Sequence, residues 1–269
     1  IAERDPEVVV SPEELEGLTQ RIEDESGAMA AFYRALLRTA LGETGAVTRV
    51  AHFGDSTIAL DGITETVREN LQARFGDAGH GFVLAARGSL PYRHHDVRHE
   101  SEGSWRIQDI THLSLADGHY GLGGVQSRAV TNASAWFATD DDDDATVGSA
   151  VSRFDVLFQR HDRGGHFRWR VDEGEWTEVD TRAEASSDDV VSIPVPDGPH
   201  RLDLRASGHG ETRLYGVVLE RDGPGVVYDS LGMVGARAAR MMGFEPAHLR
   251  GQLETRGTDL VVVGFGGND

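Results

Sequence analysis

The spacing of apolar residues indicates helices and one strand near the start of the chain. Met29, Phe32 and Leu36 recur every three or four residues, which predicts a helix with one buried face. Residues 47–53 form an extended apolar run, and the helical spacing returns in residues 58–75. This order predicts an α/β segment in which a strand lies between two helices.

From about residue 88 to residue 221 the helical spacing gives way to alternation of apolar and polar residues. Turn sequences such as Asp172–Gly174 separate the alternating runs at the spacing of an antiparallel sandwich. The runs predicted as strands are Phe154–Phe158, Phe167–Val171, Val190–Val195, Leu202–Leu204 and Leu214–Leu219. We therefore predict a β-sandwich module, jelly-roll-like, in this part of the chain.

After Gly225 the α/β pattern returns. Val226–Tyr228 is predicted as a short strand, Ala236–Met242 as a helix and Leu260–Val263 as a terminal strand. Strands that alternate with helices predict a parallel sheet, because parallel neighbours need long crossover connections.

The predicted fold class is accordingly α/β, a parallel sheet with flanking helices that an antiparallel β-sandwich interrupts. The expected division is a first part of the α/β domain at 13–87, the inserted module at 88–221 and a second, incomplete part of the α/β domain at 222–269.

Composition and charge narrow the classes of partner. Of the 269 residues, 39% are apolar and 26% are charged, which is typical of a globular protein. The net charge of −19 and the scattering of 26 basic residues, all arginine, disfavour nucleic acid and anionic membranes as partners. No apolar run is long enough to insert into a membrane, and the absence of cysteine excludes disulfides and thiolate chemistry.

Gly54-Asp55-Ser56 stands where the extended run 47–53 meets the next helical segment. A serine in this position projects from a rigid edge, and free N–H groups at the start of a helix can stabilise negative charge on a substrate oxygen. Ser56 is therefore a candidate nucleophile.

Three sequence blocks in order resemble the SGNH (GDSL-like) hydrolases. His52–Ser56 is similar to the first block of that family, Gly232–Ala236 to the second and Gly266–Asp269 to the third, Gly-x-Asn-Asp. Each block follows a predicted strand. The segment Arg74–Phe82 and the β insertion are similar to envelope esterases that act on O-acetylated polysaccharides such as peptidoglycan.

The resemblance implies a flavodoxin-like sheet and assigns a role to each matching residue. Ser56 would be the nucleophile, and the oxyanion hole would consist of the backbone N–H groups of Ser56 and Gly235 and the side-chain amide of Asn268. Asp55 would be a positioning residue. The resemblance implies no metal and no cofactor.

The family takes its general base and the orienting carboxylate from an Asp-x-x-His block after the third block. We expect that block outside this chain, and we therefore expect the chain alone to be nearly inactive. Two earlier matches, Asp96–His99 and Asp109–His112, are at the frequency expected by chance. His52 is expected to be a packed histidine, because neighbours on a strand point to opposite faces.

The remaining conspicuous residues favour structural roles. Asp140–Asp144 is predicted to be a solvated loop, because contiguous carboxylates do not converge on a calcium ion. Tyr92–His95 could line the cleft, but a linker at the entry to the module is the favoured interpretation. The aromatic residues of the module could form a platform for sugar rings, but the sandwich core is the favoured interpretation for Trp136, Phe167, Trp169 and Trp176.

Three classes of function are compatible with the sequence. The favoured one is a serine ester hydrolase that removes O-acetyl groups from a carbohydrate polymer, and the resemblance implies an extracytoplasmic location, although the chain as printed carries no signal peptide. The alternatives are a non-catalytic glycan-binding protein on an SGNH-like scaffold and a doubly wound domain that binds a small anion. The absence of basic patches makes the last alternative the weakest.

Overall fold

The computed structural model describes residues 22–112, 115–140 and 147–269. The part of the expected α/β segment before residue 22, and aspartates 141–144 of the acidic run, lie outside the described residues.

A three-stranded parallel sheet forms the centre of the α/β part. Its order is β13 (Gly225–Gly232), β1 (Val47–Gly54) and β14 (Leu260–Gly264). In chain order this is second, first, third, which is how a flavodoxin-like sheet begins. The parallel sheet predicted from the sequence is therefore present, and β13 is longer than the expected strand.

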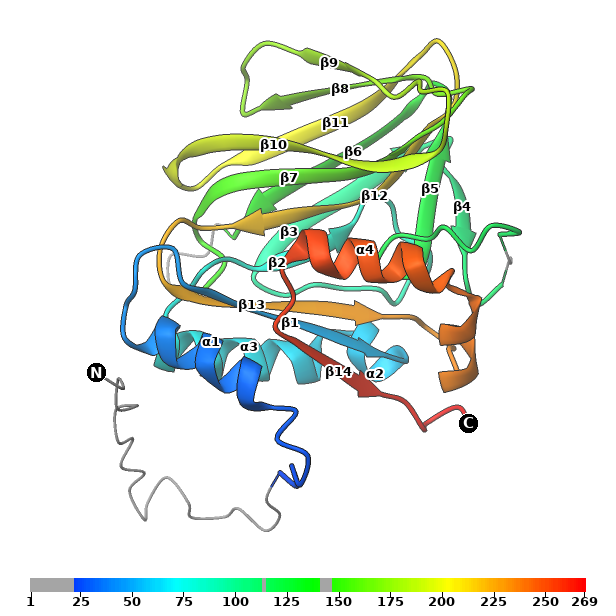
Figure 1. Cartoon of the computed structure of the whole chain (residues 1–269). Helices are drawn as coiled ribbons and strands as arrows, with labels where there is room; N and C mark the ends of the chain where they lie inside the picture. Colours follow the sequence, from blue (N-terminus) through cyan, green and yellow to red (C-terminus); the bar gives the residue numbers. More distant parts are fainter. Residues whose placement is uncertain (1–21, 113–114, 141–146) are drawn as a thin grey trace.

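Helices α1 (Ala30–Ala40) and α3 (Gly62–Phe75) cover one face of this sheet (Figure 1). The α1 side chain Thr39 shares a 2.8 Å hydrogen bond with Thr48 of β1 across that interface. The continuous helix expected over 58–75 was wrong. The single turn α2 (Ser56–Ala59) ends before α3 begins, because Asp61 between them adopts a left-handed conformation with φ of 61°.

The region after β13 also differs from the expectation. The predicted helix 236–242 is a short 3₁₀ segment, η2 (Ala238–Gly243), and helix α4 (Pro246–Arg256) follows it. The sequence pattern did not predict α4 because the helix has few apolar residues, although Glu245 caps its N-terminus and Gly257 ends it in a left-handed conformation. No helix of the described segments is long and apolar enough to span a bilayer.

The module consists of two antiparallel sheets, as predicted. The six-stranded sheet contains β10 (Ser187–Gly198), β7 (Val151–Arg160), β12 (Thr212–Glu220), β5 (Val125–Ala129) and β4 (Arg106–Asp109), with β2 (Gly81–Leu84) paired to β12. The five-stranded sheet contains β3 (Val97–Gly103), β6 (Ala133–Thr139), β11 (Arg201–Gly208), β8 (His166–Val171) and β9 (Thr177–Asp180). Because β2 precedes residue 88, strands of the module sheets begin before the boundary expected from the sequence.

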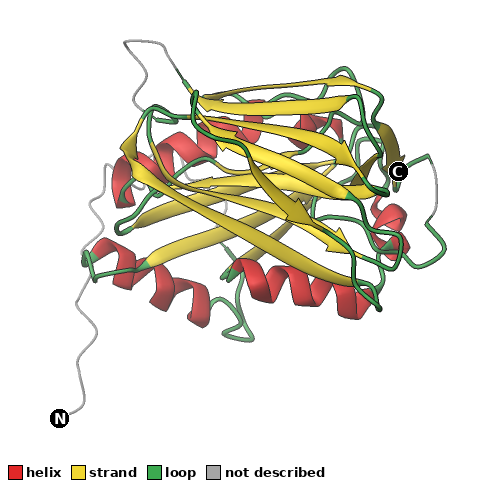
Figure 2. Cartoon of the chain, turned by 90° about the horizontal axis from the view of Figure 1, so that it is seen from above, coloured by secondary structure: helices red, strands yellow, loops and turns green. Residues whose placement is uncertain are grey.

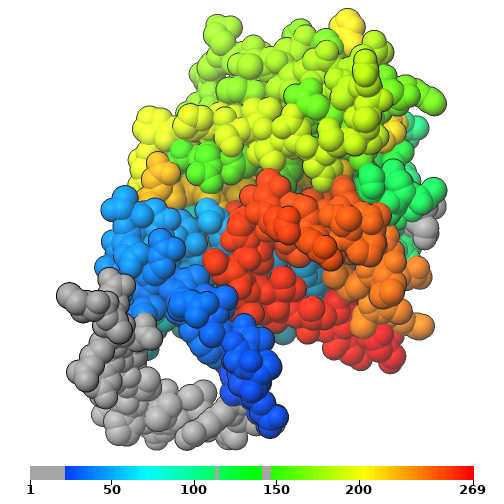
Figure 3. Space-filling view, in the orientation of Figure 1, coloured from blue at the N-terminus to red at the C-terminus, as the bar shows by residue number. Residues whose placement is uncertain are grey.

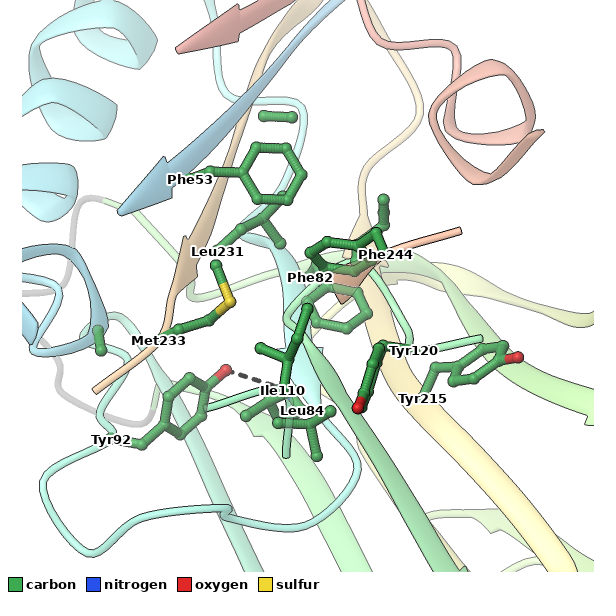
Figure 4. Packing of buried hydrophobic residues seen from close by; sticks show 14 of the residues in the cluster. Phe53, Phe82, Leu84, Tyr92, Ile110, Tyr120, Tyr215, Leu231, Met233 and Phe244 are labelled. Carbon is green, nitrogen blue, oxygen red and sulfur yellow. Dashed lines mark hydrogen bonds between the residues drawn. The ribbon is translucent and has the colours of Figure 1, made fainter. Parts of the chain in front are cut away.

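The six-stranded sheet is covered on both faces. One face packs on the five-stranded sheet through a cluster that includes Phe154 and Phe167. The other face packs on the parallel sheet, where Phe82 and Tyr215 belong to the same cluster as Phe53 of β1 (Figure 4). The module thus covers, together with α4, the face of the parallel sheet that helices alone would cover in a doubly wound fold (Figures 1 and 3).

Alternation along β8 is as predicted. Phe167 is fully buried, and Trp169 and Val171 pack against the same core. Arg168 and Arg170 point the other way and pair with Glu178 and Asp203.

The expectation that all four aromatic residues lie in the core was wrong for Trp136 and Trp176. Trp136 lies between Ala135 and Phe137, which are buried, so alternation directs its ring to the outer face of the five-stranded sheet. Trp176 stands in the turn before β9 and stacks with arginines on that same face.

A buried ion-pair network joins the module to the α/β part. Arg256 of α4 donates to Asp229 of β13 at 2.9 Å and pairs with Glu220 at the end of β12. Glu220 also accepts hydrogen bonds from Arg49 of β1 and Arg153 of β7. Burial alone would raise the pKa of Glu220, but the Arg256 and Arg49 guanidiniums lower it to about 2.

We expect Asp229→Ala to lower the free energy of unfolding by about 3–5 kcal/mol. Arg256 then stays buried with Glu220 as its acidic partner, and Arg49 and Arg153 already share that carboxylate. The same change removes the acceptor of the Phe82 N–H, which donates to Asp229 at 2.9 Å. Urea unfolding at neutral pH measures the loss. The control is Glu43→Ala, which breaks an exposed pair with Arg38 and is expected to leave stability nearly unchanged. Equal stability of the two variants would contradict the importance of the network.

Candidate active site

The carboxyl ends of the three parallel strands lie level with one another. Gly54 of β1 pairs with Gly232 of β13 on one side and with Gly264 of β14 on the other. The loops that follow these glycines carry the three sequence blocks, so the sheet brings the blocks to one edge (Figure 1). Such an edge is where open α/β sheets bind their ligands.

Asp55 fixes the turn that presents Ser56. Its buried carboxylate accepts hydrogen bonds from the backbone N–H and the hydroxyl of Thr57, both at 2.9 Å, which caps α2. Ser56 is the first residue of that turn and is half-buried. With a helix of only one turn, a macrodipole contributes little, so the individual N–H groups are what this position offers.

Gly232 allows α2 to lie directly against β13. A Cβ atom at this position would stand 1.9 Å from the backbone nitrogen of Ala59. The amide of the next residue, Met233, donates to the carbonyl of Gly54 at 2.9 Å, which ties the second loop to the end of β1. Any larger residue at Gly232 would separate the two blocks.

Two backbone donors of the site have no partner in the part of the chain that the structure describes. Neither the N–H of Ser56 nor the N–H of Gly235 donates a hydrogen bond to a described residue. Gly235 has φ of 77°, and a Cβ atom built there would meet nothing within 4 Å, so the backbone is open at this point. Free N–H groups of this kind can receive a developing oxyanion.

The third loop contacts both of the others. The Asn268 side-chain nitrogen donates to the carbonyl of Ala236 at 3.1 Å, and the Asp269 carboxylate accepts from the N–H of Ala238. On the other side, a Cβ atom at Gly267 would lie 3.0 Å from the Asp55 carboxylate. The Asn268 amide nitrogen carries two hydrogens, so its bond to Ala236 leaves one N–H for another acceptor.

The two earlier Asp-x-x-His matches do not form a catalytic pair with Ser56. Asp96 binds Arg68, and its partner in the motif, His99, instead stacks on Phe137. His112 is 74% exposed and lies 3.7 Å from Asp109 in a turn. Among the described residues the Ser56 hydroxyl has no hydrogen-bond partner, so no general base is in place there.

His52 is packed, as expected from alternation along β1. Its Nδ1 lies 3.0 Å from the Tyr228 hydroxyl, and the two rings meet edge to face. Burial lowers the pKa of His52, which favours the neutral ring.

The interpretation of Tyr92–His95 as a linker was wrong, because Tyr92 and His94 are buried. The Tyr92 hydroxyl lies 2.6 Å from His94 Nε2, and His94 Nδ1 lies 2.6 Å from His80 Nε2. The Tyr92 hydroxyl also accepts the Leu84 N–H, which anchors the segment to β2. Sequence spacing does not reveal this cluster, because its members come from separate loops.

Asp61, His80 and His94 have the donor atoms of a possible metal site, since these atoms lie within 4.8 Å of one another. The Asp61 carboxylate is nevertheless fully used. Arg68 donates to both of its oxygens, and the Thr64 hydroxyl and the His95 N–H donate as well. A cation here would have to displace a buried guanidinium, so we interpret the cluster as structural.

A cavity of about 680 Å³ lies between α4 and the six-stranded sheet, away from Ser56. Its wall contains Asp188, which accepts from the Tyr215 hydroxyl at 2.8 Å and lies 3.3 Å from His248. The other nitrogen of His248 already contacts Gln252 and the carbonyl of Tyr120. The sequence analysis missed this group, whose members come from β10, β12 and α4.

The comparisons with known proteins agree with the fold. No family model and no curated protein sequence matches the chain. A solved structure of a peptidoglycan O-acetylesterase superposes with a TM-score of 0.68 at 21% identity, over 90% of this chain and 62% of that one. The chain therefore has the fold of this esterase and spans less than two thirds of its length.

Two other solved structures are similar over smaller parts. A family two carbohydrate esterase from Cellvibrio japonicus has a TM-score of 0.27 at 15% identity, and the superposition covers 64% of this chain and 53% of the esterase chain. A family 35 carbohydrate-binding module from Clostridium thermocellum has a TM-score of 0.31 at 11% identity, and the superposition covers 47% of this chain and 99% of the binding module.

The buried histidines predict how stability depends on pH. Burial lowers the pKa of His94 from 6.5 to about 4, and it lowers those of His80 and His99 as well. Because the unfolded chain takes up these protons at higher pH than the folded chain, the free energy of unfolding should fall as the pH drops from about 6.5 towards 4. His94 alone accounts for up to about 3 kcal/mol of this loss.

Urea unfolding between pH 7 and pH 4.5 measures the slope. His94→Asn should be less stable at pH 7 but should lose less stability on acidification than the wild type. His112→Asn changes an exposed histidine and should keep the wild-type slope. An unchanged slope in His94→Asn would show that His94 is not buried as a neutral ring.

Proposed function

We propose that this protein is a serine ester hydrolase that removes O-acetyl groups from a carbohydrate polymer. The observation that carries the proposal is that Ser56 and Gly235, which follow neighbouring strands at the carboxyl edge of a parallel sheet, each have a backbone N–H without a partner among the described residues. Acyl transfer requires such donors close to a nucleophile, and we propose that these two N–H groups serve the Ser56 hydroxyl in this way.

In the proposed reaction the Ser56 hydroxyl attacks the ester carbonyl. The carbonyl oxygen becomes an oxyanion that accepts hydrogen bonds from the N–H groups of Ser56 and Gly235 and from the Asn268 amide. Collapse of the tetrahedral intermediate releases the sugar hydroxyl and leaves an acetyl-serine, which water then hydrolyses. Asp55 takes no proton in this scheme, because its carboxylate is occupied in holding the turn before Thr57.

The general base is proposed to be the histidine of the Asp-x-x-His block that the resemblance places after the third block. A serine hydroxyl without an adjacent base is a weak nucleophile, so the 269 residues alone should show little turnover. The need for a general base follows from chemistry and does not depend on the identity of the substrate, whereas the block that would supply it is what the resemblance implies.

The proposed substrate class rests on the fold, which is that of a structure named as a peptidoglycan O-acetylesterase. An envelope or secreted location is proposed on the same basis. The charge of −19 supports a partner other than nucleic acid.

We expect Ser56→Ala to abolish release of acetate from an acetylated glycan, because the nucleophile is lost. Asn268→Ala should lower kcat by about a hundred- to a thousandfold, with a smaller effect on KM, because the amide acts mainly on the oxyanion. The assay uses the protein together with the segment that carries the Asp-x-x-His block.

Ser186→Ala, in an exposed loop of the module, is the matched serine control and should keep full activity. Thermal unfolding shows whether the variants are folded. Wild-type turnover in a folded Ser56→Ala protein would exclude Ser56 as the nucleophile, and the favoured alternative would then be a glycan-binding protein on the same scaffold.

A further inference from the structure

The outer face of the five-stranded sheet is open to solvent and carries aromatic and charged side chains. The inner face of this sheet packs on the six-stranded sheet. Seen from the module side, no helix of the described residues covers the outer face, and the helices lie behind the strands (Figure 2). A hollow of about 400 Å³ lies on the outer face, and Trp136, Trp176 and Arg205 line it. Large aromatic side chains on a solvent-facing sheet are uncommon in the absence of a ligand or partner.

Arginines stack on both tryptophans. The Arg201 guanidinium lies 4.2 Å from the ring centre of Trp136, and Arg205 and Arg170 lie 4.0 Å and 4.8 Å from that of Trp176. Stacking holds a guanidinium in one plane and leaves its N–H edges directed away from the ring. Stacking therefore holds each guanidinium in an orientation that can bind a planar acceptor such as a carboxylate.

Arg205 differs from the other arginines of the hollow. Arg170 and Arg201 both bind the Asp203 carboxylate, at 3.1 Å and 2.9 Å. Arg205 is exposed and makes no ion pair or hydrogen bond with any described residue. Its cationic fork is therefore available to an external carboxylate.

The neighbours of Arg205 complete the hollow. Ser134 of β6 stands directly opposite Arg205, and Glu102 of β3 stands opposite Ser134. Ser134, Trp136 and Arg205 all line the hollow, and the small Ser134 side chain fills little of it. Glu102 and the Ser134 hydroxyl can accept hydrogen bonds from sugar hydroxyls at the floor and rim of this space.

We propose that this hollow binds a carboxylate-bearing saccharide. The Arg205 guanidinium pairs with the sugar carboxylate, and Glu102 accepts from hydroxyl groups. Arg201 covers one face of the Trp136 ring, and the other face packs against the apolar face of a sugar ring. The chain has a net charge of −19, which repels a long polyanion along its whole length. Salt at physiological concentration screens charges more than about 8 Å away, so a short ligand is repelled mainly by the charges nearest to it. A short acidic oligosaccharide fits these conditions better than a long polyanion.

This proposal does not rest on the proposed esterase activity. The hollow contains neither Ser56 nor any other residue of the three sequence blocks. The binding experiment is done with the Ser56→Ala protein, so that no ester is hydrolysed during the measurement and a failure of the esterase proposal leaves the result intact.

Titration calorimetry at 0.15 M salt compares oligogalacturonate with its methyl ester, which has the same sugar rings without the charge. We expect binding of the acid form and at least about tenfold weaker binding of the ester, because charged hydrogen bonds to Arg205 are lost. Arg205→Gln and Trp136→Ala should each weaken binding of the acid form by about tenfold or more. Arg182→Gln, an exposed arginine elsewhere in the module, should bind like the parent.

A thermal unfolding midpoint equal to that of the parent shows that a variant is folded. If Trp136→Ala does not fold, the affinity of Arg205→Gln alone tests the proposal. Absence of binding to oligogalacturonate overturns the proposal, and so does equal binding of its methyl ester. Equally tight binding of a sulfated dextran oligosaccharide would show general anion binding and would also overturn it, as would unchanged affinity in folded Arg205→Gln.

Discussion

The structure depends on the burial of Arg256 between two carboxylates from different sheets. Asp229 belongs to the parallel sheet and Glu220 to the module, and Arg256 on α4 binds both. Desolvating these charges costs several kcal/mol for each ion, which only close and complete pairing offsets. Removal of one partner is therefore costly, and the module is fixed in one position on the parallel sheet rather than joined to it by a flexible linker.

That position determines what the carboxyl edge of the parallel sheet can do. With α1 and α3 on one face and the module with α4 on the other, the level ends of β1, β13 and β14 are the part of the sheet where loops can converge. Gly232 then lets α2 approach the second loop closely, and Gly235 leaves its backbone open.

The two sheets of the module have different roles. The six-stranded sheet packs on a neighbouring layer at both faces, and its side chains contribute to this packing, to the network around Glu220 and to the wall of the cavity beside α4. The five-stranded sheet has a free face, and Trp136 and Arg205 lie on that face. Recognition of a ligand by the module would therefore use the outer sheet, and recognition at Ser56 would use the parallel sheet, with the covered sheet between them.

The sequence alone determined the parallel strands, the alternating module strands and the position of Ser56 at a strand end, because local periodicity and the residues Gly54–Ser56 specify them directly. It did not determine the break at Asp61, the helix α4 or the burial of His94. Each of these depends on side-chain contacts that local periodicity does not report, namely those of Asp61 with Arg68, of Arg256 with Asp229 and of His94 with His80. Only the tertiary structure decided that Trp136 faces solvent, because burial depends on what packs against each side of the sheet.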